Sequence, residues 1–195
     1  GVALISSQNA KLEVDAKRSM DLHGHANITL DGIPSTEIEW LAGDSVEAGL
    51  TKAIDQATIV LAAEMMGSAR EALERTVDYL GDREQFDVKL GTFQALQHRC
   101  AQMFCELELA ESAVSAALTG LDHGAPNLSA LASSAKALAN DCFTLISSEA
   151  VQLHGGMGVT EEMDIGLFLK RSRVCNQLLG SSSYHRDRFA RLTGF

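Results

Sequence analysis

Two short segments of the sequence combine residue types that bind phosphate groups and flat aromatic rings. The first reads Asp-Arg-Glu-Gln-Phe at 82–86 and is followed by Gly-Thr-Phe-Gln-Ala at 91–95. Arg83 carries a planar fork of N–H donors that matches a phosphate, and Phe86 can lie against a ring. The segment therefore predicts a turn that contacts a phosphorylated, ring-containing ligand, and a plain turn between helices explains it equally well.

The second segment reads Gln-Leu-His-Gly-Gly-Met-Gly at 152–158. Glycine has no side chain, so another molecule can approach the backbone closely. Gln152 carries both a donor and an acceptor, which suits the edge of a heterocycle. A ligand contact and a helix cap are both compatible with this pattern.

Other constellations point to structure rather than chemistry. No Glu is followed three residues later by His, so the sequence does not predict a di-iron site of the helical-bundle type. His23 and His25 share one face of a strand without an evident third ligand, and we expect no metal site. The acids of the second helix, from Glu106 to Glu111, are interpreted as a solvated face. No glycine-rich phosphate loop follows a strand, which argues against a doubly wound nucleotide fold.

The elements that must position these residues are mainly helical. Between about 46 and 192, apolar residues recur at spacings of three or four in four stretches. The first two run about 30 residues, or ~45 Å, and helices of that length pack best as an antiparallel four-helix bundle. Residues 1–45 contain only short strand-like runs. We therefore expect the end of a β-domain at 1–45 and a four-helix bundle at 46–195.

Composition narrows the function classes. The chain has 195 residues and a net charge of −10, a poor balance for binding nucleic acid or an anionic membrane. No apolar run reaches the ~18 residues that span a bilayer. The four cysteines lie in helical-looking apolar stretches, which favours buried thiols in a reducing compartment. We therefore expect a cytoplasmic location.

Together, the two segments resemble the C-terminal domain of the acyl-CoA dehydrogenases. Residues 79–86 match the family's helix that ends in an Arg-x-x-Phe turn, and Phe-Gln-Ala at 93–95 matches its next helix. Residues 152–158 match its Gln-x-x-Gly-Gly-x-Gly motif in full. The strand-like residues 26–34 and the turn from Trp40 to Gly43 resemble the end of the family's middle β-domain.

The resemblance implies an FAD-dependent oxidoreductase of lipid metabolism. Family members remove an α-proton and a β-hydride from an acyl-CoA thioester, and the bundle contacts the FAD of a neighbouring subunit. It thus implies a homo- or hetero-oligomer, a dimer or a tetramer. Asp55 is expected, on a weaker match, to face the CoA side of the substrate. The residues implied to bind the cofactor are Arg83, Gln85, Phe86, Phe93, Gln94, Gln152, Leu153, His154, Gly155, Gly156 and Ser181.

The sequence departs from the family where the catalytic base is expected. The usual base is the Glu of a Glu-Gly-Thr stretch, and the matching residue here is Leu179. The alternative position on the first bundle helix corresponds to about Ala57, which is also inert. The favoured hypothesis is a non-catalytic subunit or fragment that completes the flavin site of an acyl-CoA dehydrogenase complex. The alternatives are an active dehydrogenase that uses Asp55 or Glu64, and a flavin-free structural relative.

Overall fold

The computed structural model describes residues 1–9 and 11–195 of the chain. They form two compact units, Gly1–Ile54 and Asp55–Phe195. The division falls inside the long helix α1 (Asp44–Asp82), close to the boundary at 45/46 expected from the sequence. Each unit is described by itself.

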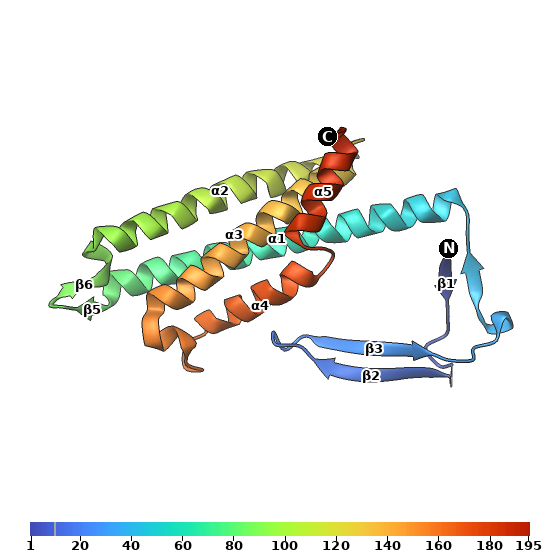
Figure 1. Cartoon of the computed structure of the whole chain (residues 1–195), viewed down its shortest axis with the longest axis horizontal. Coiled ribbons are helices and arrows are strands. Elements are labelled where there is room, and N and C mark those ends of the chain that lie inside the picture. The colour runs from blue at the N-terminus through green and yellow to red at the C-terminus, as the bar shows by residue number, and fades with distance from the viewer. Residues whose placement is uncertain (10) are drawn as a thin grey trace. The chain divides into compact units, whose positions relative to one another are not determined.

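The first unit contains two small antiparallel strand pairs. Strand β1 (Val2–Leu4) pairs with β4 (Glu39–Leu41), and β2 (Leu12–Arg18) pairs with β3 (Gly24–Leu30) in the register Leu12↔Leu30 (Figure 1). Every residue of β3 is exposed. Two-stranded ribbons of this kind are marginally stable alone in water. The expected short N-terminal β segment is confirmed.

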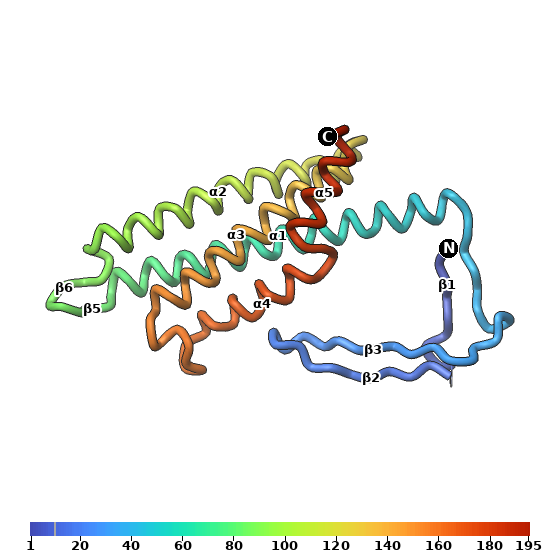
Figure 2. Tube along the Cα trace, in the orientation of Figure 1, coloured from blue at the N-terminus to red at the C-terminus, as the bar shows by residue number. Residues whose placement is uncertain are grey.

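The second unit is built from helices. After α1 come α2 (Gln94–Asp122), α3 (Leu128–His154), α4 (Ile165–Gln177) and α5 (Ser182–Thr193), and α3 packs against α2, α4 and α5 (Figures 1 and 2). A single core joins all of them except α5. Many of its buried residues are alanines, which let neighbouring helices approach closely. The predicted mainly α, bundle-type fold is confirmed.

The predicted fourth helix is interrupted. The structure divides it into α4 and α5, which are separated by residues 178–181. Leu179 has φ +57° and Gly180 has φ +110°, values that a helix cannot accommodate. Ser181 then caps α5, because its side-chain oxygen accepts a hydrogen bond from the Tyr184 backbone N–H at 3.4 Å.

A tight hairpin interrupts the connection from α1 to α2. Strands β5 (Glu84–Gln85) and β6 (Val88–Lys89) pair antiparallel, and a 3₁₀ turn at Leu90–Thr92 leads into α2. Phe86 and Asp87, at the tip, have φ +56° and +62°. Two consecutive left-handed residues are typical of a type I′ turn. The expectation of helices alone between 46 and 192 did not include this hairpin.

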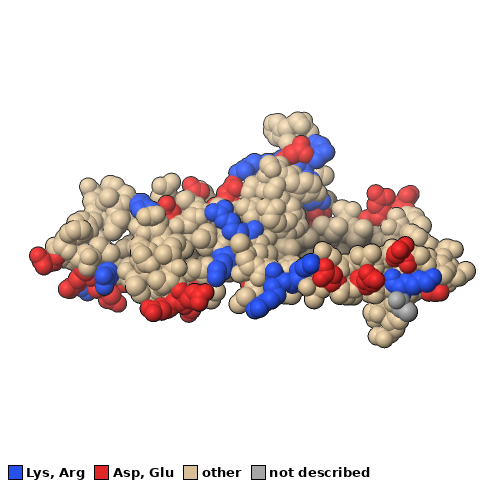
Figure 3. Space-filling view, turned by 60° about the horizontal axis from the view of Figure 1, so that its bottom comes forward, with Lys and Arg blue, Asp and Glu red and all other residues tan. Residues whose placement is uncertain are grey.

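Acidic and basic side chains are both present in small groups on the face shown in Figure 3. In the part of the chain that the structure describes, no helix is both long and apolar enough to cross a membrane.

The four cysteines are free thiols. Cys142 and Cys175 are buried as expected, whereas Cys105 is exposed.

Candidate functional site

The hairpin after α1 presents its side chains outward. The Arg83 backbone N–H donates to the Tyr79 carbonyl and its carbonyl accepts from the Leu90 N–H, both at 2.8 Å, so the main chain is closed on itself. The side chains of Arg83, Gln85, Phe86, Phe93 and Gln94 are exposed. Within the described residues, the Arg83 guanidinium has no ion pair. It is therefore available to an anion.

Phe86 is a highly exposed aromatic residue at the tip of this hairpin. Its side chain is 83% exposed, and its ring meets the Phe93 ring edge to face at a centroid distance of 6.2 Å. A bulky residue in the left-handed region carries backbone strain, and such strain concentrates at binding sites. The pair forms an aromatic surface beside Arg83.

The glycine-rich motif at the end of α3 is partly exposed and partly buried. Gln152, Gly155 and Gly156 are exposed, whereas Leu153 and His154 are buried. Gly155 has φ +61°, and a Cβ added to either glycine would meet no atom within 4 Å. The backbone of these glycines is therefore open to another molecule, while the side chains of Leu153 and His154 face the protein.

A stack of two rings joins the two motif segments. The Tyr79 and His154 rings lie 4.2 Å apart and 23° from parallel, and the Tyr79 hydroxyl donates to the His154 carbonyl at 3.4 Å. His154 Nδ1 in turn donates to the Ala150 carbonyl at 2.8 Å. The hairpin and the glycine segment consequently lie at the same end of the bundle (Figure 2). This contact across 75 positions was not foreseen from the sequence.

The segment that matches the catalytic position lies elsewhere along the bundle. Leu179 follows the far end of α4, whose 13 residues span ~20 Å from the glycine segment at 1.5 Å per residue. Its side chain is 39% exposed. The Ser181 hydroxyl, expected to face the flavin, lies 3.0 Å from the Ser183 hydroxyl.

The two weak candidates for a replacement base are both engaged. Asp55 is 2% exposed and pairs with Arg188 of α5 at 2.7 Å, while Ser129 of α3 donates to its other oxygen at 2.5 Å. Glu64 pairs with Arg171 of α4 at 2.7 Å. The position of Asp55 gives it no exposed face toward a substrate, so the expected substrate contact lacks support. Ala57 is exposed and carries no ionisable group.

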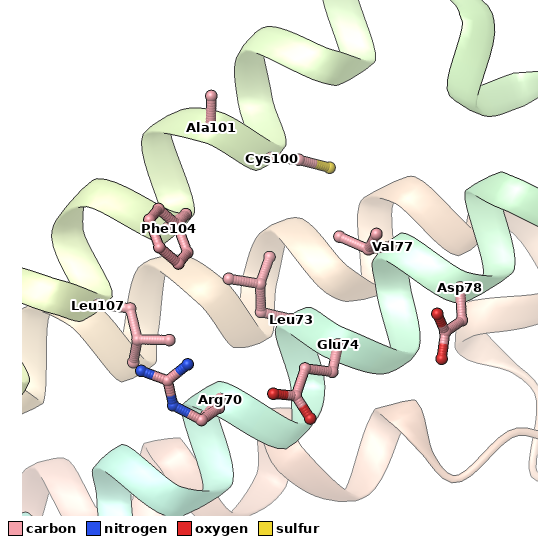
Figure 4. Close-up of a pocket in the computed structure, with 9 residues that line it drawn as sticks. All are labelled: Arg70, Leu73, Glu74, Val77, Asp78, Cys100, Ala101, Phe104 and Leu107. Atoms are coloured by element: carbon pink, nitrogen blue, oxygen red, sulfur yellow. The ribbon is translucent and has the colours of Figure 1, made fainter.

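A separate groove of about 580 Å³ lies between α1 and α2. Leu73 and Val77 of α1 point toward Phe104 of α2 across its apolar floor (Figure 4). Arg70 at its rim binds Glu111 and Glu108 of α2, each at 2.9 Å, and these bonds raise its pKa above the usual value. Those two acids, expected to be merely solvated, therefore tie the helices together. None of the expected cofactor residues lines the groove.

The main polar cluster that sequence reasoning missed is buried. Lys136, Asn140 and His185 surround the Leu179–Gly180 segment, and all three are almost inaccessible to solvent. The available signal was a single lysine in an alanine-rich stripe of α3. The described residues contain no group of three or more His, Cys, Asp or Glu side chains that could hold a metal ion.

Comparisons with known proteins all point to the same family. The family model for the acyl-CoA dehydrogenase C-terminal domain matches residues 49–193. Acyl-CoA dehydrogenase IpdE2 of Mycolicibacterium smegmatis is 40% identical over 126 residues, 65% of this chain and 39% of that protein. Acyl-CoA dehydrogenase FadE34 of Mycobacterium tuberculosis is 37% identical over 169 residues, 86% of this chain and 23% of that protein. The chain thus spans well under half the length of these relatives.

Solved structures share the fold. The Tcur3481–Tcur3483 steroid ACAD variant has a TM-score of 0.87 and 29% identity, covering 100% of this chain and 52% of that chain. Butyryl-CoA dehydrogenase from Megasphaera elsdenii has a TM-score of 0.86 and 22% identity, covering 98% and 51%. The second likeness concerns the fold alone.

Proposed function

Because the chain belongs to the acyl-CoA dehydrogenase family, as a match to the C-terminal domain, we propose that it completes the flavin site of a dehydrogenase assembly without supplying the base. At the level of the family it is an oxidoreductase chain. The observation that carries the proposal is the joining of the Arg83 hairpin and the glycine segment at one end of the bundle. Two motifs that the sequence marked as separate candidate ligand contacts are neighbours in space.

The residues at this end fit the phosphate and ring parts of FAD. Arg83 would neutralise the pyrophosphate, since its guanidinium is exposed and has no ion pair among the described residues. Phe86 and Phe93 would lie against the cofactor, and Gln85 and Gln94 would hydrogen-bond it. When bound, FAD supplies the acceptor for the hydride.

The glycine segment would hold the adenosine side of the same cofactor. Gln152 is exposed and can pair with a heterocycle edge. Gly155 and Gly156 leave open space above the backbone, which suits close approach of a flat group. Leu153 and His154 would contribute through their backbone, because their side chains are buried.

Neither position at which the family places its base, Leu179 or about Ala57, carries a group that could take the α-proton. A general base must come within about 2.6–3.2 Å of the atom that carries the proton, or reach the proton through one water. The side chain of Leu179 is a hydrocarbon, and the carboxylates of Asp55 and Glu64 are committed to Arg188 and Arg171. A partner chain with a Glu at the corresponding position would have to perform proton removal from the acyl-CoA thioester.

An assembly of more than one subunit follows from a half-site of this kind. The Tcur3481–Tcur3483 steroid ACAD is named for two components, which supports a hetero-oligomer of dehydrogenase-like chains, a dimer or a tetramer, beside the homo-oligomeric alternative. The free thiols support the proposal of a cytoplasmic location.

Flavin retention tests the proposed half-site. The full-length subunit is co-purified with its partner as wild type, Arg83→Ala and Lys89→Ala, and the flavin released on denaturation is quantified per assembly. Lys89 is an exposed cation of the same hairpin and serves as the matched control. We expect loss of most flavin only in Arg83→Ala. Full flavin occupancy in Arg83→Ala would contradict the proposal.

A further inference from the structure

A fully buried lysine occupies the centre of the contact between α3, α4 and α5. Lys136 is 0% exposed. Its ammonium nitrogen donates to Asn140 Oδ1 at 2.6 Å, to the Cys175 carbonyl at 2.9 Å and to the Gly180 carbonyl at 3.3 Å. An ammonium has three N–H donors, so each has its own acceptor. No carboxylate takes part in these bonds.

The charge is held by backbone dipoles. Cys175 lies in the last turn of α4, where unpaired carbonyls give the helix end a partial negative charge that favours a cation. Burial lowers the pKa of Lys136 to about 8. At neutral pH the group is still largely charged and can make all three bonds.

Two further buried side chains hydrogen-bond to the main chain at Leu179 and Gly180. Asn140 Nδ2 donates to the Gly180 carbonyl at 3.3 Å, beside Lys136. His185 Nε2 donates to the Leu179 carbonyl at 2.8 Å. Two successive carbonyls are thereby fixed by side chains from two helices.

The stretch that they hold is strained. A leucine in the left-handed region costs about 1–2 kcal/mol relative to an ordinary conformation. A Cβ on Gly180 would lie 2.6 Å from Tyr184 Cδ1 and 2.9 Å from His185 Nε2, so only glycine fits there. Strained residues persist only where their surroundings over-determine them. The three polar side chains provide that constraint.

We propose that Lys136, Asn140 and His185 are positioning residues that hold Leu179 and Gly180 in their left-handed conformation. They act on main-chain carbonyls, so the direction of the Cα–Cβ bond at position 179 does not depend on which side chain stands there. The chain therefore keeps a frame that would orient a carboxylate at 179, although the residue there is leucine. The hold on the main chain rests on the contacts alone, whereas the reference to a carboxylate at 179 rests on the proposed function.

The conformation can be read directly by NMR. The ¹³Cα and ¹³Cβ shifts of Leu179 report its left-handed backbone in the labelled 195-residue chain. We expect Lys136→Met to move these shifts toward ordinary values and to speed exchange of the flanking Leu178 and His185 amides by about tenfold. Lys170→Met, which removes an exposed lysine of α4, is the matched control and should change neither.

A pH titration separates positioning from simple packing. In the wild type, the carbonyl ¹³C shifts of Leu179 and Gly180 should move together as Lys136 loses its proton. The titratable groups facing the cluster are the Cys175 thiol of α4 and the His185 imidazole of α5, with Arg188 and Asp55 acting on that imidazole. Lys136→Met should abolish this common titration, while Lys170→Met should keep it.

Unchanged Leu179 shifts and unchanged amide exchange in a folded Lys136→Met chain would overturn the proposal. Should that variant fail to fold, Asn140→Ala and His185→Phe remove the other two contacts singly. Each is then expected to shift the Leu179 or Gly180 signals, and unchanged signals in both would equally overturn it.

Discussion

Removal of the Lys136 ammonium should change how stability depends on pH. Folding lowers the pKa of this lysine from 10.5 to about 8, chiefly through burial. Between these two values the unfolded chain binds the proton and the folded chain does not, so the free energy of unfolding rises with pH. Below pH 8 both states are protonated, and the full penalty of the buried charge is present. Lys136→Met has no such proton and should lack this rise.

The size of the effect follows from the pKa difference. Each pKa unit corresponds to about 1.4 kcal/mol, so a lowering from 10.5 to about 8 amounts to about 3 kcal/mol. The folded state regains most of this stability between pH 7 and pH 10, as Lys136 loses its proton. The wild type should therefore gain about 2–3 kcal/mol relative to Lys136→Met over that range.

Urea unfolding followed by far-UV circular dichroism at pH 7, 8, 9 and 10 measures the difference between the two proteins. Burial raises the pKa of the Cys100 and Cys142 thiols, the latter to about 12, which makes stability fall above pH 9. Both proteins share these thiols, so their contribution cancels in the difference. Lys170→Met should stay parallel to the wild type, because that lysine is in water in both states. The prediction fails if the free energy of unfolding changes between pH 7 and pH 10 by the same amount in the wild type and in Lys136→Met, to within about 0.5 kcal/mol.

Three other predictions concern the ion pair, the glycine segment and the flavin. Asp55→Asn should lower the free energy of unfolding by about 2–4 kcal/mol, since it leaves the partly buried Arg188 without its carboxylate. Urea unfolding measures this loss, and a double-mutant cycle of Asp55→Ala and Arg188→Ala measures the coupling energy between the two side chains. Gly158→Ala should lower the free energy of unfolding by about 1–3 kcal/mol, because the added Cβ would lie 2.5 Å from the Val151 carbonyl oxygen. Gly156→Ala should lower it far less, because a Cβ there meets no atom within 4 Å. Equal decreases of the melting temperature in the two variants would contradict this. The isolated 195-residue chain should retain little or no flavin through gel filtration, because the proposal assigns it one half of the site, and stoichiometric flavin would count against the proposal.

Periodicity predicted the long helices because their buried positions repeat locally. In α1, for example, Met65, Ala69, Ala72 and Thr76 are buried at spacings of three or four. The division of the last helix could not be predicted in this way. The break falls at Gly180 and at the Ser181 cap of α5, where Lys136 of α3 and His185 of α5 also bond the Gly180 and Leu179 carbonyls.

The two motifs of the proposed site could be singled out from the sequence because each of them is local. The Arg83 hairpin and the glycine segment were each singled out from residue types, and the positions of both as exposed turns agree with that reading. Their joining through Tyr79 and His154 spans 75 positions and depends on how the helices pack. The same holds for Asp55, whose ion-pair partner Arg188 lies 133 positions away, and its expected substrate contact stays a prediction.

Turnover by the complete subunit reveals whether this chain can remove the α-proton by itself. The full-length chain, loaded with FAD, is assayed alone against several acyl-CoA esters with an artificial electron acceptor, then with its partner, and again alone as Leu179→Glu. The account predicts no turnover by the unmodified subunit alone and turnover once the Glu-bearing partner is added. It also predicts measurable turnover by Leu179→Glu, because a carboxylate is then present in the held segment. Strong turnover by the unmodified subunit alone would contradict the account and would point to Asp55 or Glu64 as the base.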